Sequence, residues 1–299
     1  MKEPKVNIIV SLYNGEKYIR EQLNSLLEQD YPNISIHIRD DGSTDNTLEI
    51  LKEYQDIPNI HIYKGKNLGF CGSFFWLLEN VEDGDYWSFC DQDDIWYKNK
   101  VSDGVRKLEK AKNKDIPLLY FSGYRMIDEK GKEIGVWQYD VNNFIFRRNL
   151  TGTLGVGFSM IINRKLREKM LKCDYRKMHS HDWLAGAVAT GMGKVIIGKG
   201  IYADYRRLQE SVTRISFGRR VKWFVSMFTD NGDVKDRNIE FSKHFYNELS
   251  PRNKKYMDMF KNRKYNLYFA FKKAFYFKRW RPSISSEIAM RVLMLFGKV

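Results

Sequence analysis

Four units of strand, polar loop and helix follow one another at the start of the chain, and no other feature restricts the possible folds as much. The predicted strands, rich in β-branched and aromatic residues, are 6–12, 34–39, 59–63 and 85–90. Apolar residues at helical spacing predict helices over 16–29, 46–54, 67–80 and 98–112. This order indicates an α/β fold whose mostly parallel sheet is flanked by helices on both faces.

Polar clusters stand where those strands end. In open parallel sheets the ligand lies outside the carboxyl ends of the strands. The clusters are therefore expected to converge in space, although they are spread over roughly eighty residues of sequence. They are Tyr13-Asn14, Asp40-Asp41, Asn67 and the acidic group that follows the fourth strand.

That acidic group places three carboxylates within four residues, at Asp91, Asp93 and Asp94. The three repel one another, so the fold gains nothing from them unless a cation lies there. Ligands that are all oxygen suit Mg²⁺ or Mn²⁺, which complete their shell with water and with a phosphate-bearing substrate. The alternative is a solvated turn that caps the next helix.

The second half of the chain is less regular. It contains a predicted strand at 118–124, a hairpin at 125–137 and a glycine-rich, then apolar segment at 151–163. A helix at 182–190 and two short strands at 194–197 and 201–206 follow. From residue 216 onward the pattern is helical and rich in aromatic residues, so we expect a domain over 1–215 and a helical extension over 216–299.

The net charge of +14 belongs mainly to the C-terminus. From Lys254 onward, twelve lysines and arginines face only Asp258 and Glu287, a balance of +10. The charge therefore indicates a local adhesive patch and not a general footprint for nucleic acid.

Three scattered cysteines argue against a disulfide framework and against a zinc site of paired cysteines, and are typical of a reducing compartment. The first ten residues contain no long apolar stretch, so no signal peptide is expected. No apolar run approaches the ~18 residues of a membrane-spanning helix. A cytoplasmic protein is therefore expected.

Five motifs together resemble the family-2 inverting glycosyltransferases of GT-A fold. They are S-L-Y-N at 11–14, D-D-G-S-T-D at 40–45, N-L-G at 67–69, D-Q-D-D at 91–94 and H-D-W at 181–183. The variant D-Q-D-D-I-W, with G-F-S-M-I-I-N-R at 157–164, is most similar to the bacterial branch that builds surface polysaccharides, including rhamnosyltransferases. The resemblance covers roughly residues 5 to 215.

The resemblance implies that Asp93 coordinates Mn²⁺ or Mg²⁺ directly and that Asp91 reaches the metal or the ribose. It also implies that Asp182 is the catalytic base, which takes a proton from the acceptor hydroxyl as that oxygen attacks the anomeric carbon. By residue type, Asp182 would equally serve as the N-cap of a helix that begins near Trp183. His181 and Trp183 are expected on the acceptor side, with a structural histidine and a core tryptophan as the alternatives.

Asp41 is the candidate for the nucleobase, because an ionised carboxylate accepts the N3–H that uracil and thymine both present. For the same reason it does not distinguish UDP from dTDP. Tyr13 would stack on the base, and Asp94 would lie behind the metal or face the sugar; turn chemistry is the alternative for Asp41 and Tyr13. The other donor-binding candidates are Ser11, Asn14, Asn67, Arg206 and Arg207, where the arginines suit phosphate and Arg207 is otherwise a solvated surface charge.

The chain departs from the resembled family at one position. Members of this branch often carry Y-R-x-H after the last core strand, whereas this sequence reads Tyr205-Arg206-Arg207-Leu208. A leucine therefore stands where that histidine would be. If the histidine of the family helps to hold metal or diphosphate, Arg206, Arg207 or another group is expected to do so in this chain.

The C-terminal segment from Met259 to Ser286 contains no acidic residue and interleaves lysine and arginine with aromatic residues. We interpret it as an element that binds an anionic membrane surface, peripheral on the inner face of the plasma membrane, which would suit a lipid-linked acceptor. The alternative is a helical subdomain that packs on the catalytic core or on a second subunit in a homodimer.

The sequence thus predicts an inverting, metal-dependent glycosyltransferase that moves a sugar from a nucleotide diphosphate to a saccharide or lipid-linked acceptor. By resemblance, the preferred donor is dTDP-rhamnose, and the near alternative is a UDP-hexose or UDP-N-acetylhexosamine. A dinucleotide oxidoreductase is disfavoured because the first turn, Tyr13-Asn14-Gly15, lacks G-x-G-x-x-G. A nucleic-acid-binding protein is disfavoured because its acidic cluster would face a polyanion.

Overall fold

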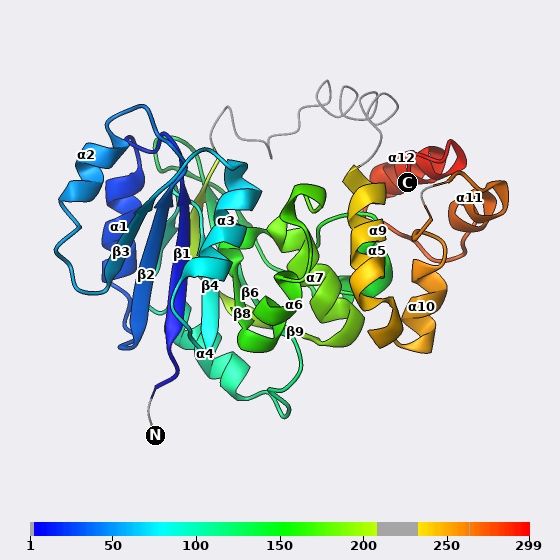
Figure 1. Ribbon diagram of the computed structural model, residues 1–299, viewed down its shortest axis with the longest axis horizontal. Helices are drawn as coiled ribbons and strands as arrows, with labels where there is room; N and C mark the ends of the chain where they lie inside the picture. Colours follow the sequence, from blue (N-terminus) through cyan, green and yellow to red (C-terminus); the bar gives the residue numbers. More distant parts are fainter. Residues whose placement is uncertain (1–2, 208–232, 263) are drawn as a thin grey trace.

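The computed structural model describes residues 3–207, 233–262 and 264–299, and its strands form one nine-stranded sheet (Figure 1). The order of strands is β3-β2-β1-β4-β8-β6-β9-β5, with β7 paired to β6. The bounds are β1 (Val6–Leu12), β2 (Ile34–Asp40), β3 (Ile60–Lys64), β4 (Tyr86–Cys90), β5 (Ile95–Trp96), β6 (Leu118–Ile127), β7 (Glu133–Trp137), β8 (Met160–Asn163) and β9 (Lys194–Arg206).

The first four predicted strands form the parallel half of the sheet, as expected. β1 pairs in parallel with β2 and with β4, and β2 pairs in parallel with β3. Beyond β4 the sheet is mixed, because β8 runs antiparallel to both β4 and β6, while β9 runs parallel to β6. The carboxyl ends of β1, β2 and β4 therefore lie at one edge of the sheet, which is where the predicted polar clusters stand.

Two expectations for the second half need correction. The short strands predicted at 194–197 and 201–206 are one strand, β9, because the glycines between them form a bulge and not a break: Phe121 pairs with Ile197, and Gly123 with Ile201. The two-residue strand β5 was not predicted from the sequence; it pairs with the end of β9. Both features arise from pairing between segments that are far apart in the sequence.

Helices cover both faces of the sheet, and the alternation of side chains on β1 decides which face each residue meets. Val6, Ile8 and Val10 are fully buried in the cluster that includes α1 (Ile19–Leu27), α2 (Thr47–Lys52) and α4 (Lys100–Glu109). Ile9 points to the opposite face, toward the cluster that includes α3 (Gly69–Asn80), α6 (Arg164–Met170) and α7 (His181–Met192).

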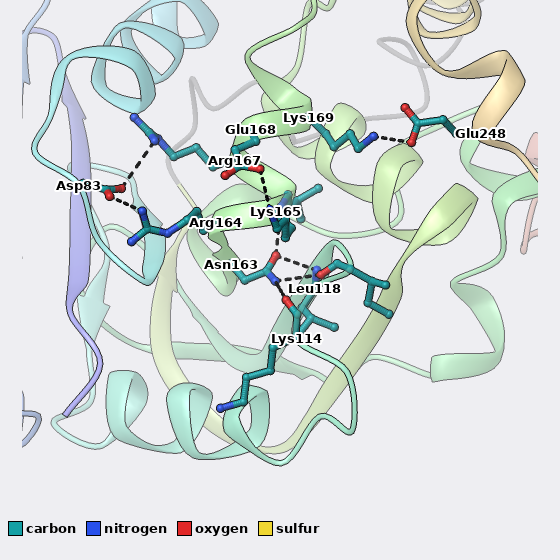
Figure 2. Close-up of polar contacts among 12 residues, drawn as sticks. Asp83, Lys114, Leu118, Asn163, Arg164, Lys165, Arg167, Glu168, Lys169 and Glu248 are labelled. Atoms are coloured by element: carbon teal, nitrogen blue, oxygen red, sulfur yellow. Dashed lines mark hydrogen bonds and ion pairs between the residues drawn. The ribbon is translucent and has the colours of Figure 1, made fainter. Parts of the chain in front are cut away.

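Asn163, the last residue of β8, fixes the end of the sheet opposite the polar edge (Figure 2). Its Oδ1 accepts the N–H of Leu118 at 2.9 Å, and its Nδ2 donates to the carbonyl oxygen of Lys114 at 3.1 Å. The next residue, Arg164, pairs with Asp83 in the connection from α3 to β4. These contacts hold β4, β6 and β8 in register below the polar edge.

The C-terminal helices lie at the far end of the molecule from β1–β3 (Figure 1). One side of them packs on the core, since Trp280, Phe241 and Leu293 belong to the same buried cluster as α3 and α7. This side of the C-terminal helices therefore packs on the half of the molecule that contains α3 and α7. The elements are α5 (Phe146–Asn149), α9 (Asp233–Phe245), α10 (Pro251–Met257), α11 (Leu267–Ala274), α12 (Ile284–Leu295) and the 3₁₀ turns η1 (Val141–Asn143), η2 (Gly157–Ser159), η3 (Tyr175–Lys177) and η4 (Tyr246–Glu248).

The boundary expected at residues 215 and 216 falls outside the described residues, as does Leu208. In the described part of the chain, none of the helices has the length and apolar character needed to cross a bilayer.

Candidate active site

A cleft with a volume of about 1070 Å³ opens at the polar edge of the sheet. Segments that are far apart in the sequence line it: the ends of β1, β2, β4 and β9, the β6–β7 hairpin, residues 153–158 and the start of α7. The predicted site residues that line it are Ser11, Tyr13, Asp41, Asn67, Asp91, Asp93, His181, Asp182 and Arg206. Asn14, Asp94, Trp183 and Arg207 are not among the lining residues.

Asp91 and Asp93 follow β4 directly, and both face the cleft. Burial raises the pKa of the Asp91 carboxyl group, and the nearby Asp93 and Asp182 raise it further. Burial also raises the pKa of Asp93, which Arg206 partly offsets. In a protein without a bound cation, these carboxylates therefore lie in an unfavourable electrostatic environment.

Asp94 lies behind this pair. Its side chain is 1% exposed; Oδ1 accepts the backbone N–H of Arg206 at 3.2 Å, and Oδ2 has no hydrogen-bond partner among the described residues. The buried ammonium of Lys100 lies close enough to act on the Asp94 charge, and burial lowers the pKa of Lys100 to about 8. Of the two positions expected for Asp94, the structure has the one behind the cleft.

The set formed by Asp91 and Asp93 fits a divalent cation. Both side chains present oxygen ligands to the cleft, and in the described part of the chain no lysine or arginine forms an ion pair with Asp91. A cation would stabilise the ionised forms of both carboxylates, which burial disfavours, and the cleft beside them has room for a phosphate-bearing ligand.

Asp41 follows β2 and is 2% exposed, yet its carboxylate contributes to the wall of the cleft. The Arg39 guanidinium pairs with Oδ1, and the Leu68 N–H donates to Oδ1 at 2.9 Å and to Oδ2 at 3.0 Å. A carboxylate has about four acceptor sites. These contacts fix its orientation and leave capacity for one further N–H donor from the cleft.

The loop after β1 is hydrogen-bonded to two other loops. Gln92 accepts the Tyr13 N–H at 2.8 Å and donates to the Tyr13 carbonyl at 3.1 Å, which leaves the Tyr13 ring 46% exposed at the cleft. Asn14, at φ 48°, accepts the Thr44 N–H at 2.9 Å and does not line the cleft. Asn14 therefore joins the loops, and the structure does not bring it to the site.

Arg206 ends β9 and is 4% exposed. Its Nε donates to the Asp93 carbonyl at 3.2 Å, one terminal nitrogen donates to Glu21 at 2.6 Å, and the guanidinium lies 4.6 Å from the centre of the Tyr18 ring. This positively charged group thus lies beside the acidic pair. Arg207 is half-buried, and its backbone N–H donates to the Ile127 carbonyl at 2.8 Å.

Asp182 lies in the first turn of α7 and shares the cleft with Asp91 and Asp93. Its Oδ1 accepts the Ser180 hydroxyl and the Trp183 N–H, the latter at 2.7 Å. The N-cap of α7 is Ser180, because the helix begins at His181, so the alternative of Asp182 as the N-cap is wrong. Burial raises the pKa of Asp182, which brings this carboxylate closer to the basicity that a general base needs.

His181 and Trp183 flank Asp182 but lie in different surroundings. The His181 ring reaches the cleft wall and stacks on Phe89 at 4.8 Å and 14°, and neither ring nitrogen has a hydrogen-bond partner among the described residues. Trp183 is fully buried, and its Nε1 donates to the Asn149 carbonyl at 2.7 Å. Of the alternatives for Trp183, the structure has the core tryptophan, so the expected acceptor contact is wrong.

The buried His181 should make the protein sensitive to acid. Burial lowers its pKa to about 3, whereas the unfolded chain protonates histidine near 6.5, so stability is lost as the pH falls through the window between these values. We expect His181 to account for a loss of about 2 kcal/mol in the free energy of unfolding between pH 7.5 and pH 5. Urea titrations at both pH values should show this extra loss in the wild type and not in His181→Leu; equal losses would contradict it.

Sequence reasoning missed the aromatic residues of the cleft. The exposed Phe70 and Trp137 and the half-buried Tyr139 line it, as do residues 153–158. Trp137 ends β7, and no local pattern marks it as a site residue. The Arg39–Asp41 pair was also missed, although the two residues stand two apart at the end of β2.

The comparisons with known proteins agree with this geometry. A family model described as glycosyl transferase family 2 matches residues 7–171, more than half of the chain. An uncharacterized glycosyltransferase of Rickettsia felis is 40% identical over 134 residues, which are 44% of this chain and 21% of that protein. The dTDP-rhamnosyl transferase RfbG of Shigella flexneri is 46% identical over 102 residues, 32% of this chain and 35% of RfbG.

A third relative matches over a longer region. The putative teichuronic acid biosynthesis glycosyltransferase TuaG of Bacillus subtilis is 27% identical over 231 residues, 75% of this chain and 87% of TuaG. The match thus spans only about a fifth of the Rickettsia protein and about a third of RfbG, but most of TuaG.

Solved structures share the fold. S. aureus TarS 1–349 superposes with a TM-score of 0.61 at 18% identity, covering 99% of this chain and 81% of TarS 1–349. Its complex with UDP-GlcNAc gives 0.57 at 16% identity, covering 98% and 91%. The mannosyltransferase PcManGT of Pyrobaculum calidifontis, in complex with GDP-Man and Mn²⁺, gives 0.53 at 15% identity, covering 99% and 75%.

Proposed function

This chain belongs to glycosyl transferase family 2, and on that premise we propose that it is an inverting, metal-dependent enzyme of surface polysaccharide assembly. It transfers a sugar from a nucleotide diphosphate to a saccharide or lipid-linked acceptor. The observation that carries the proposal is that Asp182, on α7, lines the same cleft as Asp91 and Asp93 at the end of β4.

The residues of the cleft have different roles in binding the donor. Asp41 accepts the N3–H of the pyrimidine, Tyr13 stacks on the ring, and Ser11 and Asn67 complete the nucleoside side. Asp91 and Asp93 would hold the divalent ion, whose contribution is to neutralise the diphosphate leaving group. Arg206 adds a fixed positive charge beside them.

Asp182 acts on the acceptor. Its carboxylate takes the proton from the attacking hydroxyl, while that oxygen bonds to the anomeric carbon and the bond from this carbon to the diphosphate breaks on the opposite side. The Ser180 hydroxyl and the Trp183 N–H hold Oδ1 in place, so the carboxylate is oriented before the acceptor arrives.

The preferred donor is dTDP-rhamnose. The similarity to RfbG, a dTDP-rhamnosyl transferase, supports it over a third of this chain. A UDP-sugar is the second candidate, because Asp41 treats uracil and thymine alike and TarS, which shares the fold, binds UDP-GlcNAc.

Hydrolysis of a panel of nucleotide sugars by the purified chain with Mn²⁺ tests both donors. We expect release of dTDP from dTDP-rhamnose at the highest rate. Faster release of UDP from a UDP-hexose would replace rhamnose in the proposal, and the absence of release from every pyrimidine donor would contradict the proposed function.

The exposed side of the C-terminal helices supports a second part of the proposal, contact with an anionic membrane on the inner face of the plasma membrane. From residue 264 onward, the one acidic residue is Glu287, which is buried and accepts the Trp280 N–H at 2.8 Å. Every exposed charged side chain there is positive, at Lys264, Lys272, Lys278 and Arg279. The exposed apolar side chains between and beyond them are Tyr265, Leu267, Tyr268, Phe271, Phe275, Phe277, Ile284, Ile288 and Phe296.

Basic and aromatic side chains interleaved in this way match a surface of anionic lipid, because aromatic rings enter the headgroup region while lysines stay near phosphate. A protein that packed on this surface would instead be expected to present acidic groups to it. A homodimer formed through this surface would bring like charges together.

Replacing Phe275 and Phe277 by serine should weaken binding to phosphatidylserine vesicles about tenfold or more, since each ring loses part of the ~1.5–3 kcal/mol of burying a large apolar side chain. The rings are 71% and 80% exposed, so folding should be unaffected. Vesicle sedimentation measures the binding, and the double variant Ile134→Ser/Val136→Ser on β7 is the matched control. Equal binding of both double variants would contradict the membrane contact, as would wild-type binding that is the same on neutral vesicles.

A further inference from the structure

A second cluster of ligating side chains lies on the sheet face that α3 covers. His37 on β2 and His61 on β3 are register partners, and their rings stack at 4.8 Å and 20°. Glu82, just after α3, brings its Oε1 to 3.8 Å from His37 Nε2. One ligand atom from each of the three residues lies within 4.8 Å of the others. None of the three lines the cleft.

The His37 ring is oriented as a metal ligand would be. Its side chain is 1% exposed, and its Nδ1 lies 3.1 Å from the Tyr63 hydroxyl. Its Nε2 is buried and has no hydrogen-bond partner among the described residues, which is a costly arrangement in a protein interior. A histidine whose second nitrogen is hydrogen-bonded, with the first one free, is the arrangement that metal-binding histidines adopt.

Neighbouring side chains also hold the Glu82 carboxylate in place. Glu82 Oε1 accepts the Ser35 hydroxyl at 2.8 Å, and the Lys5 ammonium lies 2.5 Å from it. Lys5 thus supplies the positive charge at Glu82 in the metal-free protein. Glu82 is exposed and His61 half-buried, so an ion can reach the cluster from solvent.

We propose that His37, His61 and Glu82 bind one zinc-class transition-metal ion. Two imidazoles and one carboxylate suit Zn²⁺, with water in the fourth position, whereas the all-oxygen set at Asp91 and Asp93 suits Mg²⁺ or Mn²⁺. The two sites therefore select different ions. The bound ion displaces the Lys5 ammonium from Glu82.

This ion joins three segments: β2, β3 and the connection between α3 and β4. His37 lies four residues before Asp41 on the same chain segment, so the ion stabilises the strand that positions the nucleobase contact. Its effect is on stability, and it takes no part in transfer.

The test is calorimetric titration of the untagged full chain with Zn²⁺ in excess Mg²⁺, which occupies the acidic pair in the cleft. We expect one equivalent of Zn²⁺ to bind and, at a hundredfold excess over the dissociation constant, a rise in Tm of about 5 °C. Absence of binding, or binding without a rise in Tm, would overturn the proposal.

Variants of the more accessible ligands make the test specific. His61→Ala and Glu82→Gln should each weaken Zn²⁺ binding about tenfold or more, while Lys5→Met should tighten it about threefold by removing the competing ammonium. His244→Ala is the matched control, because His244 lies 2.9 Å from Glu240 but belongs to no three-ligand cluster among the described residues. Zn²⁺ affinity that is unchanged in His61→Ala and Glu82→Gln, or lost in His244→Ala, would assign the ion elsewhere.

Discussion

Asp182→Asn should lower the turnover of sugar transfer about 10²–10⁴-fold, the usual contribution of a positioned general base. An amide has nearly the same shape as the carboxylate and its oxygen still accepts the Trp183 N–H, but it does not take up the proton of the acceptor hydroxyl. Donor binding should be intact, because the nucleotide contacts lie on other loops. Steady-state transfer rates and calorimetric binding of the donor measure the two quantities separately.

The substitution should leave α7 intact, since Ser180 and not Asp182 is the N-cap of that helix. A change in Tm of more than a few degrees would show that the lost activity comes from misfolding. Asp174→Asn is the matched control, because it makes the same change at a carboxylate that does not line the cleft. Wild-type turnover in Asp182→Asn would remove Asp182 from the mechanism.

The pH dependence of transfer gives an independent test of the same role. Burial raises the pKa of Asp182, and only the ionised form accepts a proton. The wild-type rate should therefore fall as the pH drops through this raised pKa. The residual rate of Asp182→Asn should lack that acid limb if Asp182 is the base.

The parallel half of the fold could be predicted because its signal is local. Alternation along β1 and helical spacing along α1 and α3 are visible in the sequence, and parallel strands place their carboxyl ends at one edge. The convergence of Asp41, Asp91 and Asp93 on one cleft followed from that topology alone. By contrast, β5 and the continuity of β9 depend on pairing between distant segments, which no local pattern records.

The roles of neighbours such as Asp182 and Trp183 were harder to separate. Consecutive residues on a helix point about 100° apart, so where the helix begins decides which residue faces the cleft. With the first turn at His181, Asp182 faces the cleft and Trp183 faces the core. Asp94 could not be separated from its neighbours for a similar reason. The chain direction after β4 places Asp91 and Asp93 at the cleft and Asp94 behind it.

Asp93→Ala should remove Mn²⁺-dependent nucleotide binding, with a loss of more than about a hundredfold in affinity for UDP or dTDP, since even indirect partners of a metal contribute about 10–100-fold. Asp93 presents oxygen to the cleft beside Asp91, and a single remaining carboxylate holds such an ion weakly. Calorimetric titration with the nucleotide, with Mn²⁺ and with EDTA, measures the metal-dependent part directly. Unchanged affinity in the presence of Mn²⁺ would exclude Asp93 from the metal site.

Measurements of Tm distinguish whether Asp93 is a metal ligand or a residue that only supports the fold. Burial raises the pKa of Asp93, so its ionised form destabilises the metal-free protein at neutral pH. The Asp93→Ala protein in EDTA should therefore be at least as stable as the wild type, and Mn²⁺ should raise the Tm of the wild type only. A structural carboxylate would show the reverse, a lower Tm in EDTA. An acidic cluster that costs stability until a cation binds is expected of a site selected for binding that cation, because a fold gains nothing else from keeping it.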